Sequence, residues 1–470
     1  MSDQINEAKL FTYPERVKSL LEGTGDIVLI DGRRITPSQI WQFMTEEGPR
    51  RFPYAFDTRM FHAGRISCDV DFLSGIKYAY IGLTWRDRLL AARKKGIPLV
   101  LSEGGSQPRD IYYAAGAVPL RPGVLSQWAR DMEEGLDLHQ ADFRHTAIMD
   151  KGRGPITIEA CNQIAAHTAI KERILDVDMV APLLCLRCSD MAYLVESYRG
   201  SRQDIPLHLI DFPVNDQANK EWAVEYLASA LRRLTSSISQ LTGVKVTEDD
   251  LMGEIKLHNK MRKLARDIHE LWWSADVPPT NSVDFGGIRT FGSDPCGVDL
   301  CSAIDLLEET RREIQKRVKN SIKGAGLIDD PVRLYVCGSC VGPNPAVVER
   351  SGGVVVGSDD WSSGFFVNVK EDGDPYVNLS TATLSLPYER PTEARAQWVA
   401  EQVRKSRADG LISIHNWGCN FQSAVSRMVA DIVKQETGIP AINIEVAELD
   451  KVEAQEQSQN RVETFIEMLQ

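Results

Sequence analysis

The sequence lacks the long apolar runs that membrane-spanning segments require. No run approaches the roughly 18–20 apolar residues needed to cross a bilayer, and the mean hydropathy is −0.24. Basic residues are also in the minority: 54 Lys and Arg stand against 66 Asp and Glu, giving a net charge of −12. Such a chain has no global basic surface for nucleic acid. The first residues, MSDQINEAKLFTYPERV, lack the regions of a secretory signal. We therefore expect a cytoplasmic protein that binds neither nucleic acid nor membrane.

Several motifs of common enzyme classes are missing as well. GxGxxG and GxxxxGK[ST] are absent, so neither a dinucleotide fingerprint nor a P-loop supports nucleotide binding. No GxSxG turn favours a hydrolase, and no HExxH pair is present. What is there is an ordinary globular composition, with 470 residues, 43% hydrophobic and 26% charged. This length and composition exclude a disordered chain and allow two or three domains with proper cores.

One local pattern recurs along the chain: a short apolar run, a glycine- or cysteine-bearing turn, then a stretch with helical spacing. Strands that alternate with helices in this way predict βαβ units on a parallel sheet. Gly-Ile-Pro triplets precede Leu99 and Ala441, as expected where a helix stops and a strand begins. The four runs with their turns are KKGIPLVLSEGG, DMVAPLLCLRC, RLYVCGSCVGPNP and DGLISIHNWGC.

The fold class predicted from this pattern is α/β, with two flavodoxin-like parallel-sheet lobes joined by a helical segment. We assign the lobes to residues 94–215 and 331–470. Residues 216–330 carry apolar residues at helical spacing, and their first helix should end at Gly243. Residues 1–93 show little apolar periodicity and are expected to form an irregular N-terminal extension.

The nine cysteines are the first chemical signal. In a chain of this kind they are more often metal ligands, redox groups or packing residues than disulfides. Ligands of open α/β sheets bind beyond the carboxyl ends of the strands. Thiolates there are favoured by the following helix N-terminus, whose N–H groups can also hydrogen-bond cluster sulfides. We interpret Cys68, Cys296 and Cys301 as small buried apolar residues. The other six lie at predicted strand-to-helix turns: Cys161, Cys185, Cys188, Cys337, Cys340 and Cys419.

Two alternatives stay open for these cysteines. The CxxC pairs Cys185/Cys188 and Cys337/Cys340 allow a zinc site, although structural zinc sites usually join such pairs over short spacers. CLRC after a strand also allows a thioredoxin-like dithiol. Either alternative leaves Cys161 and Cys419 unexplained.

Two further features belong to the predicted crevice between the lobes. His415, four residues before Cys419, is a candidate proton donor; a histidine that ends a strand and bonds to backbone is an equal alternative. The turn SEGGSQ offers backbone N–H groups near Ser102, Gly104 and Gly105 for an anionic or thioester group. We expect the crevice to be lined by residues 102–107, 185–189, 338–344 and 415–420.

Together these motifs resemble the 2-hydroxyacyl-CoA dehydratase and benzoyl-CoA reductase family over about residues 95–470. Their order and spacing carry the resemblance, from GIPLVLSEGG and PRDIYYAAGAVPL to NRVETFIEMLQ. Between these lie ITIEACNQIAAHTA, PLLCLRCSDMAYLVESY, IPLHLIDFPV, RLYVCGSCVGPNP and the segment ADGLISIHNWGCNFQSAVSRMVADIVKQETGIPAINIE. Residues 1–93 have no counterpart in it.

The resemblance implies a [4Fe–4S] cluster held by Cys161, Cys188 and Cys419, with an acyl-CoA substrate in most members. It further implies pairing with a homologous second subunit and an ATP-dependent activator as electron donor. Cys185, Cys337 and Cys340 are additional, and any of them could supply a fourth ligand or a double-cubane [8Fe–9S] cluster, as in a branch whose substrates are small molecules. Such a branch would form a homodimer.

The sequence around the last cysteine separates the candidate activities. It reads Asn416-Trp417-Gly418-Cys419 where dehydratases of the family carry Asn-Arg-Ser-Cys. We therefore predict a low-potential reductase subunit. A radical dehydratase subunit and an electron carrier without a substrate of its own are the alternatives.

Overall fold

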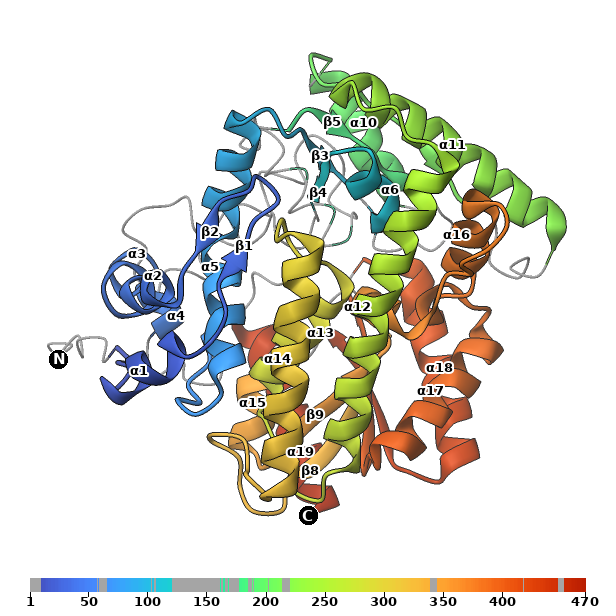
Figure 1. Cartoon of the computed structure of the whole chain (residues 1–470). Coiled ribbons are helices and arrows are strands. Elements are labelled where there is room, and N and C mark those ends of the chain that lie inside the picture. The colour runs from blue at the N-terminus through green and yellow to red at the C-terminus, as the bar shows by residue number, and fades with distance from the viewer. Residues whose placement is uncertain are drawn as a thin grey trace, which may run out of the picture.

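The computed structural model places the two predicted sheets at opposite ends of the molecule, with long helices running between them (Figure 1). In the part of the chain described, no helix is both long and apolar enough to cross a bilayer. The residues described are 10–56, 58, 66–102, 104, 107–120, 161, 164, 168, 177–184, 188, 190–201, 203–213, 220–338, 345–416, 418–446 and 452–470.

The first lobe is built on a parallel sheet of short strands. Its order is β4-β3-β5, and the next pair, β6-β7, continues the sheet, since Ile210 N donates to the Pro182 carbonyl and Val180 bridges to Leu207. If β5 and β6 are counted as one interrupted strand, the strands lie second-first-third-fourth in chain order. The elements are β3 (Leu99–Leu101), α6 (Arg109–Ala114), β4 (Val118–Leu120), β5 (Met179–Val180), β6 (Leu183–Leu184), α10 (Met191–Ser201) and β7 (Ile210–Asp211).

Alternation along β3 shows why this sheet is buried on both faces. Val100 packs into one apolar cluster with α6 and α11 (Glu221–Thr242). Leu99 and Leu101 face the opposite cluster, together with residues of α10. Side chains of a strand point alternately to the two faces, so a strand that is apolar at every position needs cover on both.

The second lobe repeats the same winding in a longer sheet. Its order is β11-β10-β8-β9, all parallel, which again places the strands second-first-third-fourth. The four strands are β8 (Val332–Cys337), β9 (Gly353–Ser358), β10 (Gly410–Asn416) and β11 (Ala441–Val446). The prediction of flavodoxin-like parallel sheets is confirmed, and each lobe has its topological switch between its first and third strands.

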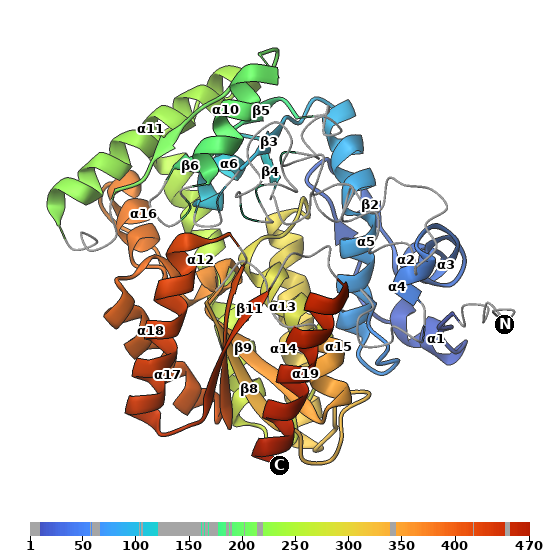
Figure 2. The same cartoon turned by 180° about the vertical axis from the view of Figure 1, so that it is seen from behind.

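Helices cover both faces of the second sheet (Figure 2). Leu334, Val336 and Ile414 pack against α15 (Pro345–Arg350) and α19 (Val452–Leu469). The opposite face meets α17 (Thr392–Ser406) and α18 (Asn420–Thr437). Both predicted Gly-Ile-Pro entries are confirmed, since Gly96 and Gly438 adopt positive φ angles and β3 and β11 begin where expected.

Long capped helices fill the middle of the chain. α11 ends at Gly243, whose φ of 76° closes the helix, as predicted. α12 (Glu248–Ser274) begins with a capping box of Thr247 and Asp250. It packs on α14, on α6 of the first lobe, on α16, whose buried residues join the same apolar cluster as α6 and α11, and on α17 beside the second lobe. The remaining elements are α13 (Ser282–Ser293), α14 (Leu300–Lys319), η6 (Trp361–Phe366), α16 (Pro375–Leu384) and η7 (Pro387–Glu389). The predicted domain limits stay a prediction.

The expectation of an irregular N-terminal extension is wrong for α5 (Leu73–Lys94), a helix of 22 residues. Fourteen of these are buried, among them Lys77 and Arg88. Lys77 Nζ lies 2.6 Å from Glu309 Oε2 on α14. Because charged and apolar residues alike are buried, the helix has no one-sided apolar stripe to read from the sequence. Before it come α1 (Arg16–Glu22), β1 (Ile27–Val28), β2 (Arg34–Ile35), α2 (Pro37–Gln42), η1 (Phe43–Glu47), α3 (Gly48–Arg51) and α4 (Pro53–Phe56).

Candidate functional site

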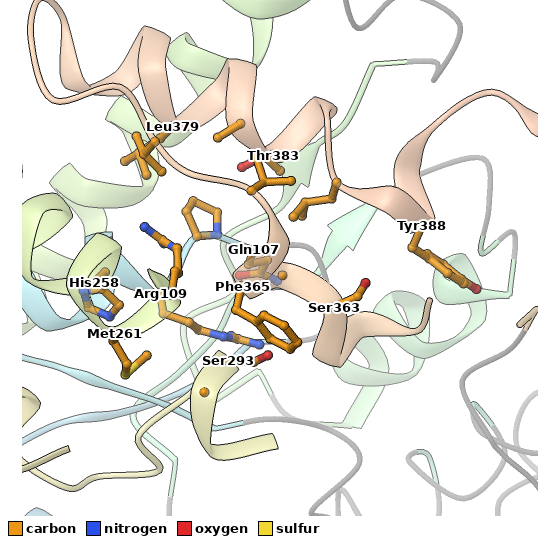
Figure 3. Close-up of a pocket in the computed structure, with 18 of the residues that line it drawn as sticks. Gln107, Arg109, His258, Met261, Ser293, Ser363, Phe365, Leu379, Thr383 and Tyr388 are labelled. Carbon is orange, nitrogen blue, oxygen red and sulfur yellow. The ribbon is translucent and has the colours of Figure 1, made fainter. Parts of the chain in front are cut away.

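A cavity lies where the first lobe, the central helices and the segment after β9 meet (Figure 3). It holds about 70 Å³ of free space, enough for a small polar group or a few water molecules. Polar and apolar side chains share its wall. It is lined by Gln107, Pro108, Arg109, His258, Met261, Arg262, Gly292, Ser293, Asp360, Ser363, Gly364, Phe365, Val367, Val369, Leu379, Ala382, Thr383, Leu386 and Tyr388.

The predicted turn after β3 contributes to this wall directly through Gln107 and indirectly through Ser102. Ser102 is fully buried and accepts a hydrogen bond from Arg109 Nη1 at 2.5 Å, so it holds a guanidinium that lines the cavity. Gly104 has a φ of 97°, and a Cβ there would stand 2.8 Å from Leu183 Cβ, which explains the glycine. Gly105 lies outside the described residues. Substrate binding by this turn stays a prediction.

A group of charged residues lies buried behind the same wall. Asp110 is fully buried and accepts from Arg262 Nη2 at 2.7 Å. His258 Nδ1 lies 3.1 Å from the Glu254 carbonyl oxygen and 3.4 Å from Glu254 Oε1. Burial lowers the pKa of His258. Burial and the nearby Asp110 and Asp299 raise the pKa of Glu254 to about 7. The predicted crevice ranges did not include these residues.

Three of the predicted cluster ligands converge on one apolar cluster. Cys161 belongs to the core beneath β3 and α10, and Cys188 and Cys419 pack against that same core. Cys161 is also held through its backbone, since its N–H donates to Asp190 Oδ2 at 2.6 Å. The structure thus brings together cysteines of both lobes that are 258 positions apart at the extremes (161 and 419). Cys185 and Cys340 lie outside the described residues.

Cys419 has a particular place in its helix. It is the N-cap of α18, directly after Gly418, whose φ is 81°. The N–H groups of a helix's first turn and its dipole favour a thiolate at this position. Gly418 adopts a left-handed backbone conformation, which glycine takes at no steric cost. This turn after β10 puts Cys419 at the start of α18.

The described cysteines do not form a single-ion site. Among the residues that the structure describes, no three His, Cys, Asp or Glu side chains are grouped to hold one metal ion. The thiolates of a cubane each bind a different iron atom, so they stand farther apart than ligands of one ion. Three thiols in an apolar surrounding, one at a helix N-terminus, are a donor set that fits such a cluster.

The remaining cysteines divide between core and surface. Cys337 ends β8 fully buried, and burial raises its pKa to about 12, so it is a neutral core residue. Cys68 and Cys296 are half-buried against the apolar core. The interpretation of Cys301 as a buried residue is wrong: it is exposed, because it lies in the first turn of α14.

His415 faces the α18 side of the second sheet. Its Nε2 lies 3.1 Å from Glu445 Oε2, and its Nδ1 lies 3.3 Å from Asn443 Oδ1 on the neighbouring strand. Ser426 Oγ of α18 is 3.5 Å from the same nitrogen. His415 is not among the residues that line the cavity. Its role as proton donor stays a prediction.

The fold and these residues define a two-lobed α/β protein with a cysteine-bearing apolar cluster and a cavity between its parts. Comparison with known families agrees with the resemblance: the family described as 2-hydroxyglutaryl-CoA dehydratase, D-component, matches residues 106–469. The chain belongs to this family. The match begins after the extension, so residues 1–105 lie outside it.

Individual relatives in the family carry both kinds of activity in their names. A benzoyl-CoA reductase subunit of Thauera aromatica is 24% identical, over 73% of this chain and 83% of its own. The alpha subunit of lactoyl-CoA dehydratase from Anaerotignum propionicum is 20% identical, over 68% and 78%. The putative dehydratase subunit YjiM of Escherichia coli (strain K12) is 24% identical, over 56% and 68%.

Proposed function

We propose that this chain is the iron–sulfur catalytic subunit of a low-potential reductase of the benzoyl-CoA reductase type, with an acyl-CoA substrate. The observation that carries the proposal is that Cys161 belongs to one apolar cluster of the first lobe, against which Cys188 and, from the second lobe, Cys419 pack. Similarity to the benzoyl-CoA reductase relative of Thauera aromatica over most of both chains supports it. When bound, a [4Fe–4S] cluster supplies one-electron chemistry at low potential.

The chain's own residues give such a site its surroundings. The apolar core keeps Cys161 buried and leaves Cys188 and Cys419 half-buried, and the start of α18 favours a thiolate at Cys419. The cavity places Arg109 and Arg262 beside Met261, Phe365 and Leu379. Such a wall offers a guanidinium to the oxygen of an acyl group and apolar contact to the carbon atoms next to it, in a space of about 70 Å³ that accepts only this small part of a substrate.

The proposed partners follow from the kind of enzyme. We propose a homologous second subunit or a second copy of this chain, and a separate ATP-dependent activator that supplies electrons. The relatives are themselves named as subunits, which supports the first of these. Cys185 and Cys340 would serve as extra ligands if the chain held a double-cubane cluster, and small molecules would then replace acyl-CoA as substrates.

The test is the iron and acid-labile sulfide content of anaerobically purified protein. We expect about four irons per chain for one cubane. The variants C161S, C188S and C419S should each lose most of this iron. C301S is the matched control, because Cys301 is exposed on α14 and should keep full iron. Full iron in all three ligand variants would refute the ligand assignment, and clearly more than four irons in wild type would favour the double cubane.

A dehydratase subunit is the second candidate. The family description and the lactoyl-CoA dehydratase relative favour it. The reactions differ in electron demand: a reductase consumes electrons with each turnover, whereas a radical dehydratase recycles the electron it receives. Turnover of a 2-hydroxyacyl-CoA with a single catalytic input of reductant would establish the dehydratase. Stoichiometric consumption of reductant with benzoyl-CoA would establish the reductase.

A further inference from the structure

Two histidines on α12 show the same backbone contact in different surroundings. His258 Nδ1 and His269 Nδ1 each lie near the carbonyl oxygen four residues earlier, at 3.1 and 2.8 Å. Nε2 of each ring has no hydrogen-bond partner among the described residues. His269 is enclosed by the rings of Phe285 and Phe365, with centroids 4.6 and 4.5 Å away. His258 lines the cavity instead (Figure 3).

The contact at Nδ1 fixes the tautomer of His258. A carbonyl oxygen only accepts hydrogen bonds, so Nδ1 carries the proton, and in the neutral ring Nε2 holds a lone pair. Since Nδ1 is turned back to its own helix, Nε2 is the ring nitrogen left for a group in the cavity. The side chain is almost completely buried, so bulk water does not satisfy it.

Carboxylates stand on the other side of this ring. Glu254 Oε1 lies 3.4 Å and Asp110 Oδ1 lies 3.9 Å from Nδ1. Asp110 is already engaged by Arg262, whereas Glu254 is partly exposed, at 19% of its side chain. Glu254 therefore connects the buried ring with solvent. The backbone carbonyl of Glu254 orients the ring, and the carboxylate of the same residue lies close enough to exchange a proton with Nδ1. A histidine held in this way with its other nitrogen toward a cavity is suited to act as a general base.

We propose that His258 exchanges protons with the substrate in the cavity, and that Glu254 is the positioning residue that relays those protons to solvent. The inference rests on the proposed function, which supplies the substrate. The electrons that reduce this substrate come from the separate activator, so His258 and Glu254 move protons only.

The transfer is balanced in both directions. When the substrate loses a proton, its H–X bond breaks and an Nε2–H bond forms, while the Nδ1 proton passes to the Glu254 carboxylate, which releases it to water. The bonding electrons stay on the substrate. When the substrate gains a proton, the ring starts doubly protonated, with the proton at Nε2 taken up from water before the substrate enters. The Nε2–H bond then breaks, an H–X bond forms with an electron pair of the substrate, and the ring is left in its neutral Nδ1–H form.

The charged and titratable groups around the pair set its pH range. Asp110 and Asp299 act on Glu254, and its pKa of about 7 allows both protonation states near neutral pH. Arg109 and Arg262 face His258 and oppose its protonation, whereas Asp110 favours it. Tyr113 packs on the ring, and Glu254 acts electrostatically on Cys301, which Lys260 also influences.

Two measurements test the proposal. In the anaerobic complex with its activator and benzoyl-CoA, H258Q should lower kcat by about 100-fold or more with unchanged iron content. E254Q should lower kcat by about 10-fold and remove the limb of the pH–rate profile near pH 7. The matched control is H208Q, since His208 Nε2 also has no hydrogen-bond partner among the described residues, and His208 does not line the cavity. A kcat of H258Q within twofold of wild type would overturn the proposal.

The second measurement needs no turnover. The infrared difference between wild type and E254Q should contain a carboxylic acid band that titrates near pH 7 and shifts in H258Q but not in H208Q. Absence of this band would overturn the relay. Failure of wild type to bind iron or to turn over any acyl-CoA would instead refute the proposed function, and the infrared result would then decide the proton pair alone.

Discussion

Arg395 Nε donates to Asp359 Oδ2 at 2.6 Å, and both side chains are completely buried. Asp359 follows β9, and its other oxygen accepts from Gly338 N at 3.1 Å, where the chain leaves β8 toward Cys340. The guanidinium also lies over the Tyr388 ring, which lines the cavity. One ion pair thus anchors the exits of two neighbouring strands.

Loss of the Asp359 charge should destabilise the second lobe. D359N leaves the Arg395 guanidinium buried without a counterion, so we expect the free energy of unfolding to fall by about 3–5 kcal/mol. Denaturant unfolding measures this. D71N is the control, because Asp71 pairs with Arg16 at the surface, and it should shift the midpoint little. Equal shifts in both variants would contradict a buried anchor.

Gly338 should tolerate no side chain. Its φ is 118°, and a Cβ there would stand 2.3 Å from the Ile414 carbonyl oxygen of the neighbouring strand. G338A should cost about 2–5 kcal/mol, from backbone strain and overpacking together. Gly373 has a φ of 79° with nothing within 4 Å, so G373A should cost only about 1 kcal/mol. Thermal unfolding of the pair separates contact from strain.

Asp284 makes stability fall as pH rises. It is buried on α13, and burial together with Asp69 raises its pKa to about 8, while Arg317 opposes the shift. Because this pKa is above that of the unfolded chain, the folded state binds more protons between about pH 4 and pH 8, and unfolding free energy declines over that range.

The variant D284N removes this titration. Its stability relative to wild type should increase from pH 5 to pH 8, by several kcal/mol at most. Melting temperatures at both pH values give the comparison. A difference between the two proteins that stays constant with pH would show that Asp284 does not carry the effect.

Cys301 should react with iodoacetamide well before Cys337. It is exposed, whereas Cys337 is buried with a pKa of about 12. Partial burial and the neighbouring Asp299 raise the pKa of Cys301, so its labelling should be slow at pH 7 and accelerate with pH. Mass spectrometry of the labelled peptides checks this, and C301S should lose the early label. Early labelling of Cys337 would contradict its place in the core.

The sequence pattern predicted the strands better than the extension. β3, β8, β10 and β11 are apolar runs bounded by glycine, and their position and parallel pairing follow from the pattern. The helix α5 was not predicted, because it is buried on several sides. Its apolar residues therefore do not recur at the 3.6-residue spacing of a helix with one buried face. Antiparallel β1 and β2 are only two residues each, too short for any alternation to show.

The sequence predicted only those residues of the candidate site that lie at turns after strands. Cys161, Cys188 and Cys419 attract attention because cysteine after a strand is uncommon, and the fold brings them onto one cluster. His258 carries no motif. The one available signal is its spacing of four from Glu254, which places both on the same side of a helix. That it meets Asp110 of the first lobe depends on packing across 148 positions of sequence (110 and 258).

The reach of α12 limits how the two lobes can move. At 27 residues it is about 40 Å long, and it is packed on α6 at one lobe and on α17 at the other. A hinge rotation of one lobe against the other would have to break one of these two helix contacts. The helix therefore opposes such a rotation. The width of the cavity then depends on the side chains that α12 places in its wall. Entry of a larger ligand requires rotamer changes in these side chains and movement of the surrounding segments, more than a change in the angle between the lobes.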